Sequence, residues 1–490
     1  MSHFPHRFLL AVVALISYPN PSAHCEVSPH TTLSLDDVLS GVQQSYPKLI
    51  ALREKRSAAR AQQRSARGLW DPKLKLKGAS SVLKGERVEV ALAELRQATP
   101  LWGAELYAGY RLGLGAFPTY KGDYETLSGG ELRAGLELPL LAGRSTDPAR
   151  AELIRSAARE GVADERLRLG LIEAERYATE AYWEWIKASQ LLKIQQELFT
   201  MAQGRAEGLK AQVEHGSKPP ITLVDNERLI LERSAEVVSA RRALSEAAYK
   251  LSLFYRSHDD LSPIYPDAGL APATLTRPQR PQLPSVEEDE VELIERHPLL
   301  RAQRKELEVA GVDLELADAL LAPSLNVSSF VARDIEGVAG ESASKLAKVE
   351  LGVGLTFELP IGLNKASGKR AEAFAKRATL EAELGGLRDA LMATIRQARV
   401  ELMADYEQAG LAHRQVQVAR KLVEGEQLKL EEGASDLIVL NLRELAYAKA
   451  EASEVKVITA YHKAWARYLS AKGQRVSRAS SPDDPKANIR

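Results

Sequence analysis

The chain has 490 residues, and its 66 lysines and arginines equal its 66 aspartates and glutamates, so the formal net charge is zero. This balance, together with the lack of a basic patch interleaved with aromatic residues, argues against nucleic acid as a partner. The one cysteine, Cys25, excludes an intrachain disulfide and a metal site built from cysteines. Charged residues mix finely with alanine and leucine over long segments, a composition typical of long helices and coiled coils.

Residues 1–25 have the pattern of a secretory signal peptide. The apolar run over residues 8–16 is too short for a membrane anchor, and residues 23–25 offer a small-x-small cleavage site. We expect cleavage after Cys25. The alternative is a lipoprotein signal with Cys25 acylated, which the residues just before the cysteine disfavour. No later stretch reaches about 18 apolar residues, so the chain could enter a membrane only as strands.

Residues 26–258 contain a short helical pattern, a strand region and a long helical hairpin, in that order. Strict alternation begins at Lys73-Leu74-Lys75-Leu76-Lys77 and continues, with interruptions, through a strand region over residues 72–140. Helical periodicity then predicts a long helix and a return helix over residues 146–256.

The same order of elements returns in residues 291–472. A helical pattern covers residues 291–321, and alternating apolar residues predict strands within 323–360. A second long helical hairpin is expected over residues 366–472.

Two segments lack either periodicity. Residues 259–290 contain six prolines and are expected to form a linker. Residues 473–490 are polar and are expected to form a disordered tail.

The most regular pattern is the long helix expected over residues 366–432. Its apolar stripe repeats every 11 residues, and its members are Leu380, Leu384, Leu387, Leu391, Ile395, Ala398, Leu402, Tyr406 and Ala409. An 11-residue period is 3.67 residues per turn, so the stripe runs nearly straight or turns slightly right-handed. At about 1.5 Å per residue the helix would be roughly 100 Å long, so it must pack sideways against similar helices.

Proline and glycine spacings indicate an internal duplication. Pro47 and Pro72 are 25 residues apart, as are Pro298 and Pro323. The corresponding strand regions differ, because 67 residues separate Pro72 from the strand-closing Pro139, but only 37 separate Pro323 from Pro360. Four to six strands are expected in all. That is too few to close a membrane barrel, so several copies would have to share one.

This ordered duplicate resembles the TolC-like outer-membrane efflux protein family over residues 33–472. The resemblance is carried by the tandem repeat, by residues 139–144 and 360–362 where strands lead into helices, and by the helix breaks at Gly216 and Gly433. It implies a mainly α fold with a membrane β-barrel segment, in which long helical hairpins and strands form a trimeric tunnel about 100 Å long. Members usually contribute four strands each, so the longer first strand region predicts either an extra strand pair or long loops.

The resemblance also implies a homotrimer in outer-membrane lipid, a periplasmic adaptor and an inner-membrane pump as partners, and no cofactor. In the family, the tip after the second glycine closes the tunnel and meets the adaptor. The candidate tip residues here are Gly216, Lys218, Asp225, Gly433, Asp436 and Asn441. Asp436 has a second interpretation, because a Ser-Asp step before an apolar run is also a helix N-terminal signal.

The function that this resemblance implies is a passive exit duct of a tripartite efflux or type I secretion system. One alternative is a periplasmic adaptor or scaffold with helical hairpins. An exported enzyme is a weaker one, because no catalytic or metal-binding set of residues was found. The Gly-Lys step at Gly368 departs from the phosphate-binding loop pattern in spacing and in the residue that follows. The transported substrate is not specified by the sequence.

Overall fold

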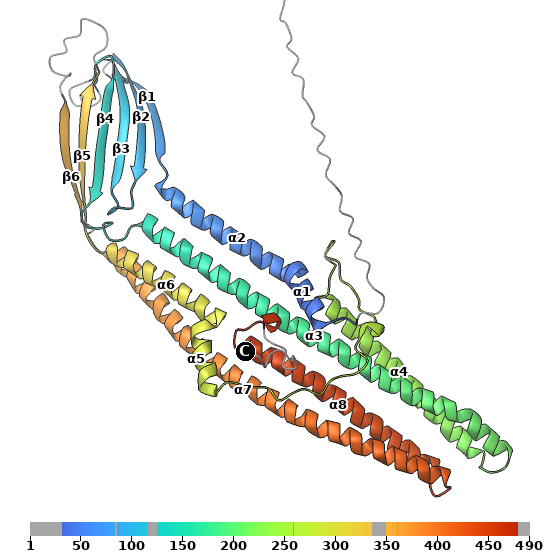
Figure 1. Cartoon of the computed structure of the whole chain (residues 1–490). Coiled ribbons are helices and arrows are strands. Elements are labelled where there is room, and N and C mark those ends of the chain that lie inside the picture. The colour runs from blue at the N-terminus through green and yellow to red at the C-terminus, as the bar shows by residue number, and fades with distance from the viewer. Residues whose placement is uncertain are drawn as a thin grey trace, which may run out of the picture.

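The computed structural model describes residues 32–83, 86–115, 117, 125–257, 259–335, 349–359 and 361–478. They form a long, bent rod with a β-sheet at one end and the tips of two helical hairpins at the other (Figure 1). The expected signal peptide with Cys25, the closing Pro360 and tail residues 479–490 lie outside the described residues.

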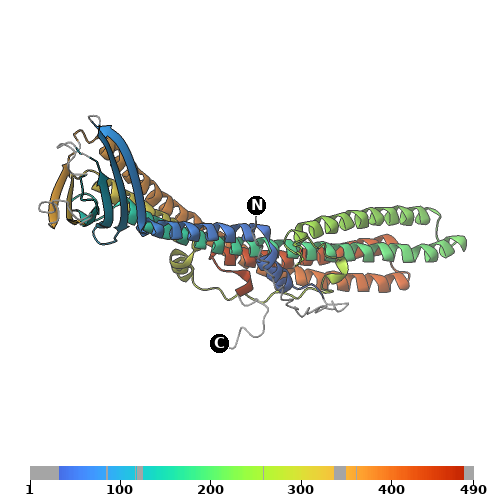
Figure 2. The same cartoon turned by 90° about the horizontal axis from the view of Figure 1, so that it is seen from above.

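Four long helices make up most of the rod. They form two hairpins, α3 (Pro148–Glu214) with α4 (Ile221–Ser252), and α7 (Asn364–Glu431) with α8 (Leu437–Ala471). Both hairpins run in the same direction away from the sheet (Figure 2). With 67 and 68 residues, α3 and α7 are each about 100 Å long at a rise of about 1.5 Å per residue.

Each repeat begins with two short helices. They are α1 (Leu35–Ser45) and α2 (Pro47–Arg67) in the first repeat, and α5 (Val286–Arg296) and α6 (Pro298–Ala319) in the second. Each break falls before a proline, because proline favours an extended residue ahead of it and is well suited to the first helical position.

The single helix expected over residues 291–321 is therefore two helices. The first also starts earlier, at Val286, inside the segment expected to be a linker. Ser285 and Glu288 form a capping box there, which satisfies free N–H groups at the start of the helix.

Six antiparallel strands form one sheet, in the order β1-β2-β3-β4-β5-β6. The first repeat supplies β1 (Lys73–Leu83), β2 (Glu86–Ala98), β3 (Glu105–Leu114) and β4 (Glu131–Pro139). The second supplies β5 (Ser324–Asp334) and β6 (Glu350–Glu358). The longer first strand region thus contains an extra strand pair that is part of the sheet.

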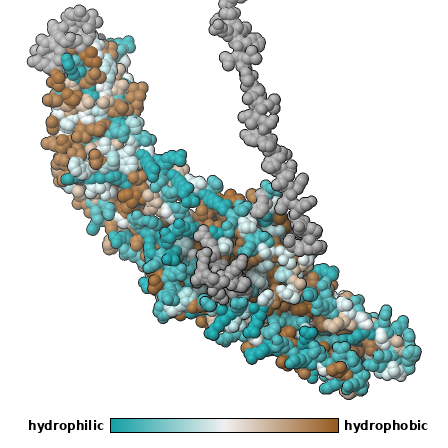
Figure 3. All heavy atoms as spheres, in the orientation of Figure 1, coloured by the Kyte–Doolittle hydropathy of each residue, from teal (hydrophilic) through white to brown (hydrophobic). Residues whose placement is uncertain are grey.

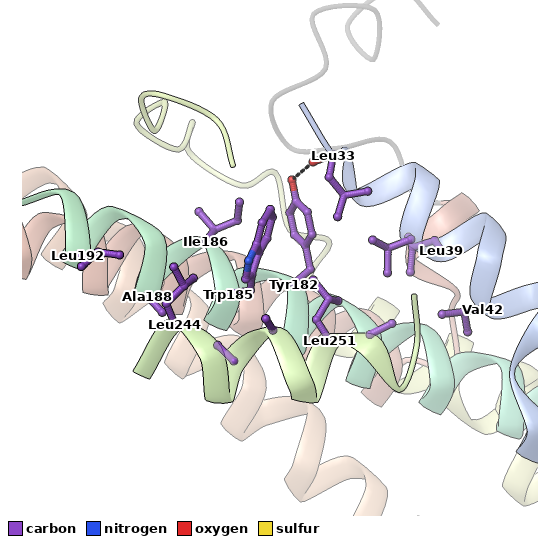
Figure 4. Close-up of a cluster of buried hydrophobic side chains, with 14 of the residues drawn as sticks. Leu33, Leu39, Val42, Tyr182, Trp185, Ile186, Ala188, Leu192, Leu244 and Leu251 are labelled. Carbon is purple, nitrogen blue, oxygen red and sulfur yellow. Dashed lines mark hydrogen bonds between the residues drawn. The ribbon is translucent and has the colours of Figure 1, made fainter. Parts of the chain in front are cut away.

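Two large apolar cores and a small third cluster between α3 and α8 hold the helices together. The first surrounds the fully buried Trp185 of α3 and includes residues of α1 and α4 (Figure 4). Next to it, the hydroxyl of Tyr182 donates a hydrogen bond of 2.9 Å to the carbonyl oxygen of Leu33. The second core joins α5 and α6 to α7 and α8 around Leu402 and Tyr461. Residues of the predicted stripe, including Ile395 and Leu402, form the buried side of α7.

Two irregular segments are tied to the helices. The chain between α4 and α5 lies along them and accepts a hydrogen bond of 3.1 Å from Tyr461 at the carbonyl of Gln279. The expected tail is ordered as far as Arg478, because Arg475 and Ser477 bind the fully buried carboxylate of Glu175. A buried carboxylate needs such partners, so the expectation of disorder from residue 473 was wrong for its first six residues. None of the described helices combines the length and hydropathy that crossing a membrane requires.

Candidate functional site

One face of the sheet is apolar and exposed. Side chains alternate between the two faces of a strand, and on this face most of them are leucine, valine, phenylalanine and small residues. Its most exposed large members are Leu74, Leu76, Val82, Leu95, Leu106, Leu132, Leu351, Val353, Leu355 and Phe357. Val353 keeps 79% of its surface exposed, and Figure 3 shows apolar residues gathered at this end of the rod. A continuous apolar surface of this kind marks contact with a membrane or a partner.

The opposite face carries paired charges. Arg96 contacts Glu94, Glu105 at 2.9 Å and Glu137 at 3.6 Å, so it joins three neighbouring strands. Tyr107 lies beside this group, with the Arg96 guanidinium 5.2 Å from its ring centre. Tyr107 therefore lies on the charged face of the sheet.

A second charged group lies further from the helices on the same face. Glu131 contacts Arg111 and also Arg133, the latter at 2.8 Å, and Arg133 lies over the ring of Phe330. A sheet with an apolar face and a charged face suits a wall between lipid and water. In the described residues, β1 and β6 each have only one neighbouring strand, so one copy does not close this wall.

Both hairpin tips turn at the glycines that the sequence singled out. Gly216 and Gly433 have φ angles of +71° and +74°, in the left-handed region that favours glycine. A Cβ at either position would meet nothing within 4 Å, so backbone conformation alone requires glycine there. Lys218 is half-buried just past the first turn, and Asp225 is exposed near the start of α4.

Asp436 lies at the N-cap of α8 and is exposed. Its carboxylate accepts a hydrogen bond of 3.4 Å from the backbone N–H of Ile438. This geometry supports the capping interpretation, and it leaves the carboxylate open to the surroundings of the tip.

A contact between the two hairpins lies close to the tips. Arg205 of α3 donates a hydrogen bond of 2.8 Å to the side-chain oxygen of Asn441 and forms an ion pair with Glu444, both on α8. Asn441 was a sequence candidate, but its role as a link between the repeats was not foreseen. Arg205 and Glu444 were missed because partners more than 230 residues apart leave no local pattern.

Comparisons with known proteins agree with this architecture. Residues 291–474 match the model of the family described as "Outer membrane efflux protein". No curated protein sequence matches the chain.

Solved structures match nearly the whole chain. The MtrE outer membrane channel of Neisseria gonorrhoeae is 14% identical, with a TM-score of 0.63 over 91% of this chain and 90% of that chain. The Campylobacter jejuni CmeC outer membrane channel is 12% identical, with a TM-score of 0.61 over 95% of each chain. The outer membrane protein VceC of Vibrio cholerae is 13% identical, with a TM-score of 0.61 over 90% of this chain and 96% of that chain. The second repeat therefore matches the outer membrane efflux protein family, and the chain shares the fold of such channels over nearly its whole length.

Proposed function

We propose that the chain is the outer-membrane channel of a tripartite efflux system, a passive exit duct with no chemistry of its own. The observation that carries this proposal is the two-faced sheet with open edges, joined to helical hairpins about 100 Å long. The sheet provides a wall that can lie in lipid, and the hairpins provide the length to continue that wall through the periplasm. The same duct would serve a type I secretion system, and the pump with which it assembles decides between the two.

Three copies are proposed to share one barrel and one tunnel. Single helices leave apolar stripes uncovered, which supports contact with further copies. On α4, Val224, Leu231 and Val238 recur every seven residues, and each is more than half exposed. A seven-residue apolar repeat is the pattern by which helices pack side by side. Val400 and Val418 of α7 are exposed in the same way.

The hairpin tips are proposed to bind a periplasmic adaptor, which connects the channel to an inner-membrane pump. Exposed apolar side chains lie on the first two turns of α4 and α8, namely Ile221, Ile438 and Leu442. Lys218, Asp225 and Asp436 surround them with charges. The combination of exposed apolar anchors and a polar rim suits a protein–protein contact.

We further propose that the link from Arg205 to Asn441 and Glu444 holds the tunnel closed at its periplasmic end. The link joins the hairpins of the two repeats close to their tips, so breaking it would loosen the α7–α8 tip, although α3 and α8 stay packed further from the turn. Docking of the adaptor at the tips would compete with it. The alternative of an adaptor or scaffold is less well supported, because it gives no use to the exposed apolar face of the sheet.

Membrane fractionation combined with native mass measurement tests this function. We expect the protein in the outer-membrane fraction as three copies, and we expect a strain lacking it to lose efflux of at least one toxic compound. A soluble monomer would overturn the proposal, as would a membrane protein whose loss changes no efflux or secretion phenotype.

A further inference from the structure

We propose that each copy contributes all six strands to the barrel, so that three copies close an eighteen-stranded barrel through seams between β1 of one copy and β6 of the next. This inference rests on the proposed trimer and deepens it, because it names the surface through which the copies meet and the size of the barrel. The occupant of each open edge is a second copy of this chain.

The directions of the strands permit this seam. All five neighbouring pairs are antiparallel, so β1 and β6 of one copy run in opposite directions. When β1 of the next copy pairs with β6, the antiparallel pattern continues without interruption around the barrel. Both edges border the apolar face, and in lipid their free N–H and C=O groups have no other partner.

The register of the sheet already contains the tilt that a barrel needs. One row of paired residues crosses all six strands: Lys73, Arg96, Tyr107, Gly135, Phe330 and Gly352. Lys73 is the first residue of β1 at the helical end of the sheet, whereas Gly352 lies six residues before Glu358, where β6 returns to that end. The row therefore moves steadily away from the helical end as it crosses the sheet.

This stagger can be converted into an angle. Six residues at about 3.3 Å each, over the five spacings of about 4.8 Å between six strands, correspond to a tilt of about 40°. Strands of outer-membrane barrels tilt by about 35–45°. The sheet of one copy thus has the geometry of a barrel segment.

Aligning the strand ends predicts the contacts across the seam. In this register the facing pairs are Lys73 with Glu358, Lys75 with Thr356, and Lys77 with Gly354. The pairing of β1 with β2 and of β5 with β6 places all six of these residues on the charged face of the sheet. Lysines of the β1 edge would therefore meet the acidic end of the β6 edge. This favours pairing of β1 with β6 over pairing of β1 with β1 or of β6 with β6.

The strand number determines where passage is controlled. Barrel diameter grows roughly in proportion to strand number, and barrels of about 16–18 strands enclose a water-filled channel. A barrel of twelve strands would be about two-thirds as wide. The strand wall of an eighteen-stranded barrel would therefore be wide enough to enclose water, so we expect the helical part to control passage.

Disulfide cross-linking in the outer membrane tests the seam. We expect the double variant Lys75→Cys/Thr356→Cys to form covalent dimers and trimers under mild oxidation, because only directly facing residues reach disulfide distance. A second pair, Lys73→Cys/Glu358→Cys, tests the seam at the rim of the barrel. A third pair, Lys77→Cys/Thr356→Cys, tests a register shifted by two residues. The matched control is Leu76→Cys/Thr356→Cys, whose cysteines lie on opposite faces and should not link.

A fifth cysteine pair identifies the rival arrangement. If β1 and β2 lay outside the barrel, β3 would become the edge, and Glu105→Cys/Thr356→Cys would link instead. That result, or a native trimer in which no β1–β6 pair links, would overturn the eighteen-stranded barrel and leave the proposed channel intact. Failure of the unsubstituted protein to form a trimer would instead overturn the proposed function.

Discussion

The two repeats hold equivalent helix junctions with different chemistry. Val38 and Asp289 each lie nine residues before the proline that starts the second short helix, and both are completely buried. Val38 belongs to the apolar core around Trp185. Asp289 instead accepts hydrogen bonds of 3.0 and 2.8 Å from the hydroxyl of Tyr468.

The buried carboxylate of Asp289 in the second repeat also has cationic partners. Lys472 lies 2.9 Å from Asp289 and 3.0 Å from Glu292, and Arg399 lies 3.0 Å from Asp289. Burial alone would lower the pKa of Lys472, but its hydrogen bonds to Asp289 and Glu292 raise it overall. The first repeat has Leu251 where the second has Tyr468, counting from the tip glycines.

One backbone junction can thus be held either by apolar packing or by buried charges. The two solutions respond differently to substitution. A buried ion pair is often no more stable than an apolar replacement, yet removing one partner is costly because the other charge stays buried.

The largest effect is expected at this charged junction. Asp289→Val should destabilise the fold by about 3–5 kcal/mol, because Lys472 and Arg399 lose their carboxylate. Thermal unfolding of the purified protein measures the loss. Glu290→Gln is the matched control, because its partner Arg396 is mostly exposed, and it should change stability by less than about 1 kcal/mol.

Adding Tyr468→Leu and Lys472→Tyr to Asp289→Val gives these three positions the residues of the first repeat, because Lys472 and Tyr255 each lie 39 residues after a tip glycine. Arg399 stays in place. This triple variant should recover part of the lost stability. If it is no more stable than Asp289→Val alone, the two junctions are not interchangeable and the comparison fails.

The long helices of the two repeats also differ in burial. α3 buries twenty of its residues and α7 only seven, although their lengths are nearly equal. Trp185→Ala in α3 should cost about 3–5 kcal/mol, because it empties a buried site. Val400→Ala in α7 should leave the unfolding of a protomer nearly unchanged but weaken the trimer, as measured by native mass in rising detergent. Equal loss of protomer stability from both substitutions would contradict the assignment of the exposed α7 surface to other copies.

The link between the repeats is expected to have an intermediate effect, visible in leakage. Arg205→Ala removes charge-assisted contacts worth about 1.5–3 kcal/mol, which corresponds to a shift of roughly tenfold or more toward open tips. Uptake of a large antibiotic and single-channel current should both rise. Arg228→Ala, which breaks an exposed pair within α4, should do neither. A closed channel in the Arg205 variant would exclude this link as the lock.

Acid is expected to weaken the second repeat more than the first. Burial lowers the pKa of His297 to about 4, and its Nδ1 accepts a hydrogen bond of 3.2 Å from the N–H of Leu299. An unfolded histidine has a pKa of about 6.5, so stability that is fully present above pH 6.5 is lost as the pH falls toward 4.

The expected loss from His297 is about 2 kcal/mol by pH 5. The equivalent residue of the first repeat is Tyr46. His297→Asn keeps an acceptor for the helix N-terminus and should flatten the decline of unfolding temperature between pH 6.5 and 4. If the decline of unfolding temperature is unchanged in this variant, a group other than His297 causes the acid sensitivity.

The smallest effect is expected at the second tip. Asp436→Ala should cost about 1 kcal/mol by removing the cap of α8, and Asp436→Ser should restore most of it. If the carboxylate also contributes to the gate, both variants should change leakage to the same extent. If leakage follows stability, Asp436 is a cap alone.

Much of the architecture was predictable from the sequence, because it is written in local patterns. The 11-residue stripe predicted α7, alternation from Lys73 predicted β1, and Gly216 and Gly433 marked turns that need a left-handed residue. Equal proline spacings indicated the duplication, and together these features were enough to predict the family. The reason is physical: periodicity and backbone preference act within a few residues of the chain.

The partners of each element were decided only by the tertiary structure. The sequence drew attention to α7, whereas α3 is the helix that the fold buries most. The sequence left four or six strands open, and only hydrogen bonding across the sheet placed all six in one wall. The partners of Arg205 and Asp289 lie 110 or more residues away along the chain. Such pairs depend on how distant helices pack, and no local pattern of residues records that choice.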